Sequence, residues 1–189
     1  MNIFHLDQDP VKAAQYHNNR HVVKLILEAA QMLSTAHRMI DGVEIVGKSP
    51  TGRKQKQYHL SDSVMNLTLY KAVHYNHPST VWTRASQQNY EWHYALFEAL
   101  CNEYTYRYGK IHKTDEKLRE ILRTPPKNIP NIGLTPFAQC MPESCKDKDP
   151  IQAYRNYYMQ EKADFCVWKN RSIPFWFITE EKRNADLCV

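Results

Sequence analysis

The chain has 189 residues, of which 42% are hydrophobic, and its formal net charge is +5. This length supports one buried core, so we expect a single domain over residues 1–189. The sequence shows neither an apolar run of about 18 residues nor a secretory leader, which argues against a membrane span and against export, and favours the cytoplasm. The moderate basic excess suits a polyanionic partner.

The cysteines are odd in number and form no CxxC pair. Such usage favours a reducing compartment, and we expect most of the thiols to lie in the core rather than to bind a metal. The five positions are Cys101, Cys140, Cys145, Cys166 and Cys188.

One long helix is predicted between Asp9 and Ile40, after a short apolar segment at residues 2–7. Asp9 can cap this helix, and Pro10 suits its first turn. At about 100° of rotation per residue, apolar side chains cover most of its circumference. The helix is therefore predicted to be largely buried.

A narrow polar stripe interrupts the apolar surface of this predicted helix. The stripe and its edge consist of His17, Arg20, His21, Lys24, Glu28, Gln31, Thr35 and Arg38. Burying charge without partners is costly. We therefore expect the stripe to line a pocket, a wet cleft or a site for a charged ligand.

The middle of the chain is predicted to contain a basic loop followed by two helices. Residues 42–58 include the run GKSPTGRKQKQ, whose Gly, Pro and basic residues indicate a flexible loop, either a solvated linker or a grip for phosphates. Residues 61–75 show the period of a helix. Pro78 disfavours helix at the preceding residue, and a further helix is predicted over residues 79–108.

The last third of the chain is predicted to be helical except for one proline-rich segment. A short charged helix is expected over residues 114–122 and a longer one over residues 151–169. Residues 124–150 hold six prolines and are predicted to be an ordered covering segment. With no convincing strand, the predicted fold is all-α, a single-domain helical bundle with a long Pro-rich covering segment.

The stripe has the residue types of a reactive site. His17 and His21 lie one turn apart, a spacing that can hold a metal, but residues 18–20 lack the Glu of a metalloprotease helix, so we predict no metal. Lys24 and Glu28 form either a self-neutralising ion pair or an acid/base pair perturbed by burial. Because no glycine-rich phosphate loop, nucleophile elbow or dinucleotide fingerprint is present, no cofactor is expected.

Two stretches, residues 104–110 and 154–158, interleave tyrosines with basic residues. Aromatic rings can stack on exposed bases while cations hold phosphates, and the alternative is a Tyr-rich core with a solvated basic rim. His77 lies in a predicted helix break, which can bind a ligand through free backbone groups or only cap a helix. These features make DNA the predicted partner.

Several motifs resemble a family of small helical phage and bacterial proteins. They are the opening Asn2-Ile-Phe-His-Leu-Asp, the helix motif His17-x3-His21-Val-Val-Lys24, Leu134-Thr-Pro136, Tyr154-Arg-Asn-Tyr157-Tyr158, and the segment from Trp168 to Trp176. The chain is also distantly similar to the phage pyrimidine-dimer DNA glycosylases of the endonuclease V type. That resemblance implies a small, basic, all-α enzyme with a catalytic first helix, acting in the host cytoplasm.

Two positions depart from the glycosylase pattern. Those enzymes attack with an N-terminal amine freed by removal of the initiator Met, whereas Asn2 is large and we expect Met1 to be retained. They also carry a Glu roughly one and a half turns beyond the helix histidine; here position 24 is Lys and the nearest carboxylate is Glu28. The resemblance therefore bears more on fold than on reaction.

The leading hypothesis is a DNA-binding enzyme, glycosylase-like in the broad sense, that acts on an extruded pyrimidine. Glu28 is the predicted acid/base or stabiliser of positive charge on the sugar, Lys24 is the candidate amine or phosphate ligand, and His17 and His21 are expected to line the base pocket. The predicted DNA contacts are Arg20, Arg38, Arg53, Lys54, Lys56, His77 and Arg155, with Tyr157 and Tyr158 as stacking residues.

Two alternatives stay open. The first is a transferase that places amino acids on activated 5-hydroxymethyluracil in DNA, similar to enzymes of phage thymidine-hypermodification systems. In that reaction the stripe would deprotonate the incoming amine and bind a departing phosphate. The second is a non-catalytic module that binds nucleic acid or protein, in which the stripe is a structural polar network.

Overall fold

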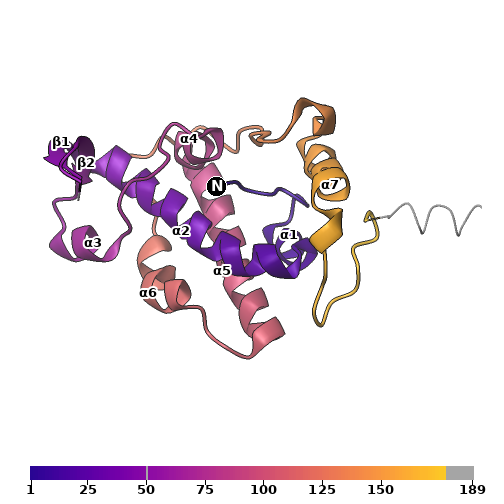
Figure 1. The fold of residues 1–189 in the computed structure, drawn as a ribbon. Helices are drawn as coiled ribbons and strands as arrows, with labels where there is room; N and C mark the ends of the chain where they lie inside the picture. Colours follow the sequence, from indigo (N-terminus) through magenta and orange to yellow (C-terminus); the bar gives the residue numbers. More distant parts are fainter. Residues whose placement is uncertain (50, 178–189) are drawn as a thin grey trace, which may run out of the picture.

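A computed structural model describes residues 1–49 and 51–177 (Figure 1). Pro50 and the predicted core thiol Cys188 lie outside the described residues. The elements in chain order are α1 (Pro10–Tyr16), α2 (Asn19–Asp41), β1 (Val43–Lys48), β2 (Lys54–His59), α3 (Ser63–Thr68), α4 (Pro78–Ala85), α5 (Gln87–Tyr108), α6 (Lys113–Leu122), the 3-10 turn η1 (Glu143–Cys145), α7 (Pro150–Glu161) and the 3-10 turn η2 (Ala163–Phe165).

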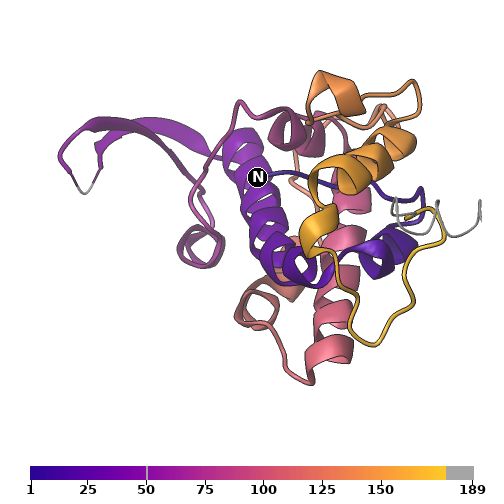
Figure 2. The ribbon, with the colours of Figure 1, turned by 45° about the vertical axis from the view of Figure 1, so that its right-hand side comes forward.

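The all-α expectation is wrong, because the segment predicted as a flexible basic loop forms an antiparallel β-hairpin. Strand β1 pairs with β2 in a register that sets Val43 opposite His59 and Lys48 opposite Lys54. At the turn, Gly52 donates its N–H to the Ser49 carbonyl at 2.9 Å and has a φ of +78°, a conformation that favours glycine. The hairpin projects from the helical body (Figure 2).

The long N-terminal helix is also divided. The sequence predicts one helix from residue 9 to 40, but the chain breaks at His17 and Asn18, between α1 and α2. The buried Asn18 caps α2, since its side-chain oxygen accepts the His21 N–H at 2.9 Å. The break leaves His17 outside α2, so the predicted stripe begins one turn later than expected.

The helix predicted over residues 61–75 forms only as the six-residue α3. A side chain of α2 explains why it ends early. Helix α3 ends at Thr68. The carbonyl of Asn66 in its last turn and those of Leu69 and Tyr70 beyond its end accept hydrogen bonds from the Arg38 guanidinium at 2.6–2.8 Å. These carbonyls therefore satisfy their hydrogen bonds without a continued helix.

The predicted helix over residues 79–108 divides at Ser86 into α4 and α5. Ser86 has an extended backbone with φ −152°, and its hydroxyl accepts the Asn89 N–H at 3.3 Å to cap α5. Helix α5 then runs unbroken to Gly109, whose φ of +65° ends it in the left-handed conformation.

The Pro-rich segment, residues 124–149, is irregular apart from η1 and packs on the body. Thr135 donates its N–H to the Asn89 side chain at 2.9 Å, and Phe137 stacks on His5 with ring centroids 3.9 Å apart. Helix α7 follows, and it ends at Glu161, before the predicted end at residue 169.

The core forms where α2 and α5 pack side by side, with α4, α6 and the N-terminal segment against them. Ile3, Phe4 and Leu6 are buried, and they carry the start of the chain across α2. In Figure 2 this start lies in front of α2 and beside α7. Among the described helices, none combines the length and apolar character needed to cross a membrane.

Candidate functional site

A pocket of about 430 Å³ lies where the N-terminal segment, α2 and α7 meet. It contains much of the predicted polar stripe together with residues from three other parts of the chain. Its lining consists of Met1, Asn2, Phe4, Arg20, His21, Lys24, Leu25, Glu28, Cys140, Tyr157, Lys162 and Phe165.

Glu28 is the carboxylate of this pocket and is almost buried. Its Oε1 lies 3.2 Å from Lys24 Nζ, one helical turn earlier, and its Oε2 lies 3.7 Å from the Met1 amino nitrogen. The Asn2 backbone N–H also donates to Oε2, at 3.0 Å. Two amino groups and one amide therefore surround the carboxylate, which stabilises its negative charge.

Asn2 holds the N-terminal segment in place through a small polar network. Its amide donates to the Cys140 carbonyl at 2.8 Å. Its side-chain oxygen accepts from the Tyr154 hydroxyl at 3.0 Å and from the Ser79 hydroxyl at 3.2 Å. Because these partners come from α4, the Pro-rich segment and α7, the position of the Met1 amine depends on the whole tertiary fold.

His21 lines the pocket in its neutral form. Burial, assisted by the nearby His17, Lys24 and Lys162, lowers its pKa from 6.5 to about 3. Its Nδ1 is hydrogen-bonded to the Tyr158 hydroxyl, and its ring lies 4.5 Å from that of Phe4. The neutral ring offers hydrogen bonding and an aromatic edge rather than charge.

His17 lies behind His21 and does not line the pocket. It is fully buried, and its Nδ1–H donates to the Ala13 carbonyl. Burial lowers its pKa from 6.5 to about 4. Tyr158 is likewise fully buried, so it holds His21 in place and is not available to stack on a ligand.

Aromatic rings and cations form the rim of the pocket. Lys162 Nζ lies 4.6 Å above the Tyr157 ring, and the Arg20 guanidinium lies 4.8 Å above the Phe165 ring. Tyr157 is half-buried and stacks on Phe4, with centroids 5.7 Å apart and planes within 11°. Two flat faces and two cations thus border the opening.

His77 lies near the pocket without lining it. It caps α4, since its Nδ1 accepts the Ser79 N–H at 3.2 Å. Burial lowers its pKa, with further lowering by the Met1 amine and His74, while Glu28 opposes the shift. His77 therefore lies close enough to the Met1 amine and Glu28 for their charges to act on it.

The other predicted DNA contacts lie elsewhere. Arg155 donates to the Leu6 carbonyl at 3.0 Å, and its guanidinium packs over the rings of Phe175 and Trp176. Arg38 is buried at the far end of α2. Three exposed cations, Arg53, Lys54 and Lys56, belong to the hairpin region.

Sequence reasoning did not assign Met1, Asn2, Cys140 and Phe165 to the site. Tertiary packing brings these residues to the pocket, and no local sequence pattern predicts that placement. Lys162 had a signal, because it follows the Tyr-rich stretch of α7 at a helical distance from Tyr157.

The described residues contain no group of three or more His, Cys, Asp or Glu side chains placed to hold a metal ion. Comparisons with protein-family models, with curated proteins and with solved structures find no match. Function therefore has to be inferred from the chemistry of the pocket.

Proposed function

We propose that this protein is a DNA-binding enzyme that acts on a pyrimidine base extruded into the pocket beside α2. The observation that supports the proposal is the placement of Glu28 between two amino groups, Lys24 Nζ and the Met1 amine, at 3.2 and 3.7 Å. A carboxylate next to an amine is the pair needed to break an N-glycosidic bond and capture the sugar.

The pocket suits an extruded nucleotide in size and in chemistry. Its volume of about 430 Å³ lies within the range of small-molecule sites, roughly 300–1,000 Å³. A base can stack on the Tyr157 ring once the Lys162 ammonium, which lies 4.6 Å above that ring, turns away to a phosphate. Arg20 and Lys162 at the rim can hold the phosphates on either side of the extruded nucleotide.

In the proposed reaction the bond between C1′ and the base breaks, and its electron pair leaves with the base, which takes up a proton. Glu28 stabilises the positive charge that develops on the sugar. The ammonium group of Lys24 or Met1 first releases a proton to solvent, and the amine nitrogen then bonds to C1′ and loses a second proton. Opening of the sugar ring then gives an imine, which water hydrolyses.

A transferase acting on activated 5-hydroxymethyluracil is the second candidate. The observation that favours it is charge: Arg20, Lys24 and Lys162 line the pocket with Glu28 as the only carboxylate among the described lining residues. Such an excess of cations suits the departure of a phosphate or pyrophosphate.

The test is borohydride trapping on duplexes that carry a uracil, a thymine dimer, an abasic site or 5-hydroxymethyluracil. Wild-type protein is expected to give a covalent adduct whose position, read by peptide mass spectrometry, is Lys24 or Met1. Glu28→Gln is expected to lower single-turnover base release by at least about 100-fold. Glu116→Gln, an exposed glutamate of α6, is the matched control and is expected to retain activity.

The alternatives give different results. Transfer of labelled amino acid to pyrophosphorylated 5-hydroxymethyl DNA, without an adduct, would establish the second candidate. If Lys24→Ala and Glu28→Ala bind DNA normally, and the wild type turns over none of the substrates, the protein is a binding module. That result would overturn the enzymatic proposal.

A further inference from the structure

The β1–β2 hairpin carries its cations on one face. Residues directly opposite each other in an antiparallel pair share a face, and the face alternates along the strands. The register therefore places Lys48, Lys54 and Lys56 together, with Glu44, Val46 and Tyr58. The other face carries no charged Lys, Arg, Asp or Glu, since its members are Val43, Ile45, Gly47, Gln55, Gln57 and His59.

The tip of this basic face is electrostatically unfavourable in the free protein. Lys48 lies directly opposite Lys54, and like charges in a cross-strand pair destabilise a hairpin. Lys56 is compensated by Glu44 at 2.8 Å, whereas no ion pair of Lys48 or Lys54 occurs within the described residues. A polyanion along this face would remove the repulsion.

The hairpin is also under-packed for a structure that folds without a partner. A two-stranded sheet is marginally stable in water. Here Val43 and Val46 are 68% and 71% exposed, and Tyr58 is the buried strand residue that anchors the hairpin to the body. The ribbon projects past the end of α2 (Figure 2), so both of its edges are open to a partner.

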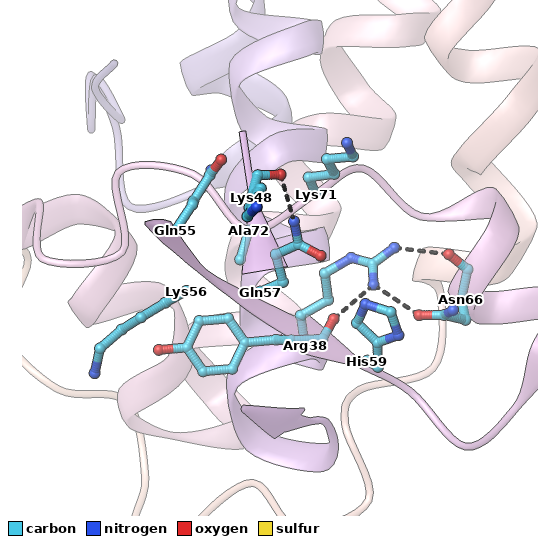
Figure 3. A pocket seen from close by; sticks show the side chains of 10 residues that line it. Arg38, Lys48, Gln55, Lys56, Gln57, His59, Asn66, Lys71 and Ala72 are labelled. Carbon is cyan, nitrogen blue, oxygen red and sulfur yellow. Dashed lines mark hydrogen bonds between the residues drawn. The ribbon is translucent and has the colours of Figure 1, made fainter. Parts of the chain in front are cut away.

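A second pocket, of about 310 Å³, lies at the base of the hairpin. Figure 3 shows the cationic side chains around it, with the Arg38 guanidinium turned toward Asn66. Among its described lining residues are four cations and no Asp or Glu: Arg38, Lys48, Lys56 and Lys71. The exposed Lys71 thus extends the positive surface from the hairpin to the body of the protein, whereas the Arg38 guanidinium is buried.

We propose that the hairpin is an arm that lies along duplex DNA on one side of the target nucleotide. This inference rests on the proposed function. A two-stranded β-ribbon fits the major groove, and the lysines of the basic face match the charge of the phosphate backbone. Polyanionic DNA is therefore the occupant that both the shape and the charge of the arm favour.

The geometry sets where the arm reaches. Ten residues separate Glu28 from Arg38 on α2, which is about 15 Å along the helix axis. The six-residue strands are about 20 Å long and leave the end of α2 at an angle (Figure 2). At roughly 3.4 Å per base pair, the hairpin begins about 4 base pairs beyond the extruded base and reaches no farther than about 10, on that side alone.

The experiment measures binding to duplexes that contain a tetrahydrofuran abasic analogue as the probe. Each duplex carries a flank of about 14 base pairs on one side of the analogue and about 3 on the other, in both orientations. Wild-type protein is expected to bind one orientation about tenfold more tightly. In Lys48→Gln/Lys54→Gln the two orientations are expected to bind equally, and the slope of log K against log salt is expected to fall by about 1.8.

The matched control is Lys110→Gln/Lys113→Gln, which removes two exposed lysines between the end of α5 and the start of α6, outside the hairpin. It is expected to keep the preference of the wild type. The melting temperature of Lys48→Gln/Lys54→Gln is expected to equal or exceed that of the wild type, because the opposed charges are gone. Neither variant touches the pocket at Glu28.

The outcomes separate the arm from the proposed function. The arm would be overturned if the hairpin and control variants lost DNA affinity equally, or if the wild-type protein bound both duplex orientations equally. This holds even if base release by the wild type is intact. Salt-dependent, one-sided binding that depends on Lys48 and Lys54, without base release, would support the arm and count against the enzymatic proposal. DNA affinity that is indifferent to salt would overturn both.

Discussion

Arg38 is a buried cation whose hydrogen-bonding capacity is entirely used inside the protein. Its five N–H donors reach four backbone carbonyls and one side-chain oxygen, at 2.6–2.9 Å. The acceptors are Tyr58, Asn66, Leu69 and Tyr70. A guanidinium so committed has no donor left for a phosphate. At the scale of single residues, the cation therefore fixes the hairpin and α3 to α2.

Replacing Arg38 with Gln is expected to destabilise the fold without weakening DNA binding by the folded protein. The change leaves several buried carbonyls unsatisfied, at a cost of about 3 kcal/mol or more in the free energy of unfolding. Urea denaturation measures this loss. Arg53→Gln, at an exposed position, is the control and is expected to change stability by less than about 0.5 kcal/mol.

Two results would contradict this role of Arg38. One is a stability within about 0.5 kcal/mol of the wild type. The other is a native-like fold in which the salt dependence of DNA binding falls by about one phosphate contact, which would make the residue a DNA ligand instead.

The sequence predicts one of the two contacts that Glu28 makes with amino groups but not the other. The contact with Lys24 is predictable, and the contact with Met1 is not. Lys24 and Glu28 are four residues apart, so helix geometry alone brings them together. The Met1 amine and the Asn2 N–H reach the same carboxylate only because the N-terminal segment folds across α2. That placement depends on contacts with α4 and α7 that no local pattern encodes.

At the scale of elements, helical periodicity located most helices, and capping decided where they end. The sequence predicts one helix over residues 9–40, because its apolar period continues through His17 and Asn18. The structure breaks there because Asn18 forms a buried cap and also donates to Cys166 Sγ at 3.3 Å. Asn is a good cap but is tolerated inside helices, so its tertiary contact decides between the two.

The hairpin was missed for a different reason. Residues 54–58 alternate Lys and Gln before Tyr58, but the alternation is between two polar residue types, so it lacks the apolar-polar contrast of a half-buried strand. The basic composition and the turn residues at 47–52 are equally typical of a loop. Strand formation here depends on pairing and on anchoring through Tyr58.

Removing the Asn18 cap is expected to destabilise the protein more than removing an exposed cap. Asn18→Ala loses the buried hydrogen bond to the His21 N–H and the contact with Cys166, an expected cost of about 2 kcal/mol. Asn18→Ser restores a cap and is expected to recover part of the loss. Asp62→Ala, which removes the exposed cap of α3, is the control and is expected to cost less than about 1 kcal/mol.

Thermal unfolding of the four proteins measures these differences. If Asn18→Ala and Asp62→Ala lower the melting temperature equally, the break between α1 and α2 is not held by Asn18. A gain in helix content by circular dichroism in Asn18→Ala would show in addition that the two helices merge once the cap is lost.

At the scale of the whole molecule, the core contains an unusual number of neutral histidines. Burial is the largest cause that lowers the pKa of each, to about 4 in His17 and His37 and to about 3 in His21 and His93. The pKa of His5, stacked on Phe137, is lowered well below its usual value for the same reason. They come from the N-terminal segment, the α1–α2 junction, α2 and α5, so protonation disturbs the entire core.

These histidines are expected to make stability fall steeply on the acid side. In the unfolded chain each histidine titrates near pH 6.5, whereas in the folded protein burial lowers their pKa values, to about 4 in His17 and His37, so the unfolded state binds more protons between these values. Stability is therefore fully present above about pH 6.5 and is lost as the pH falls toward 4. His17 alone accounts for about 2 kcal/mol of loss between pH 7 and pH 5.

Urea unfolding at pH 7, 6 and 5 measures this slope, and His17→Gln tests its origin. The substitution removes one titrating group, so the variant is expected to lose about 2 kcal/mol less than the wild type between pH 7 and pH 5, even though its stability at pH 7 is lower. His59→Gln changes an exposed histidine of the hairpin and is expected to keep the wild-type slope. A wild-type stability that stays constant from pH 7 to pH 5 would mean that water reaches these rings in the folded protein, and the close packing of the N-terminal segment that places Met1 beside Glu28 would then be in doubt as well.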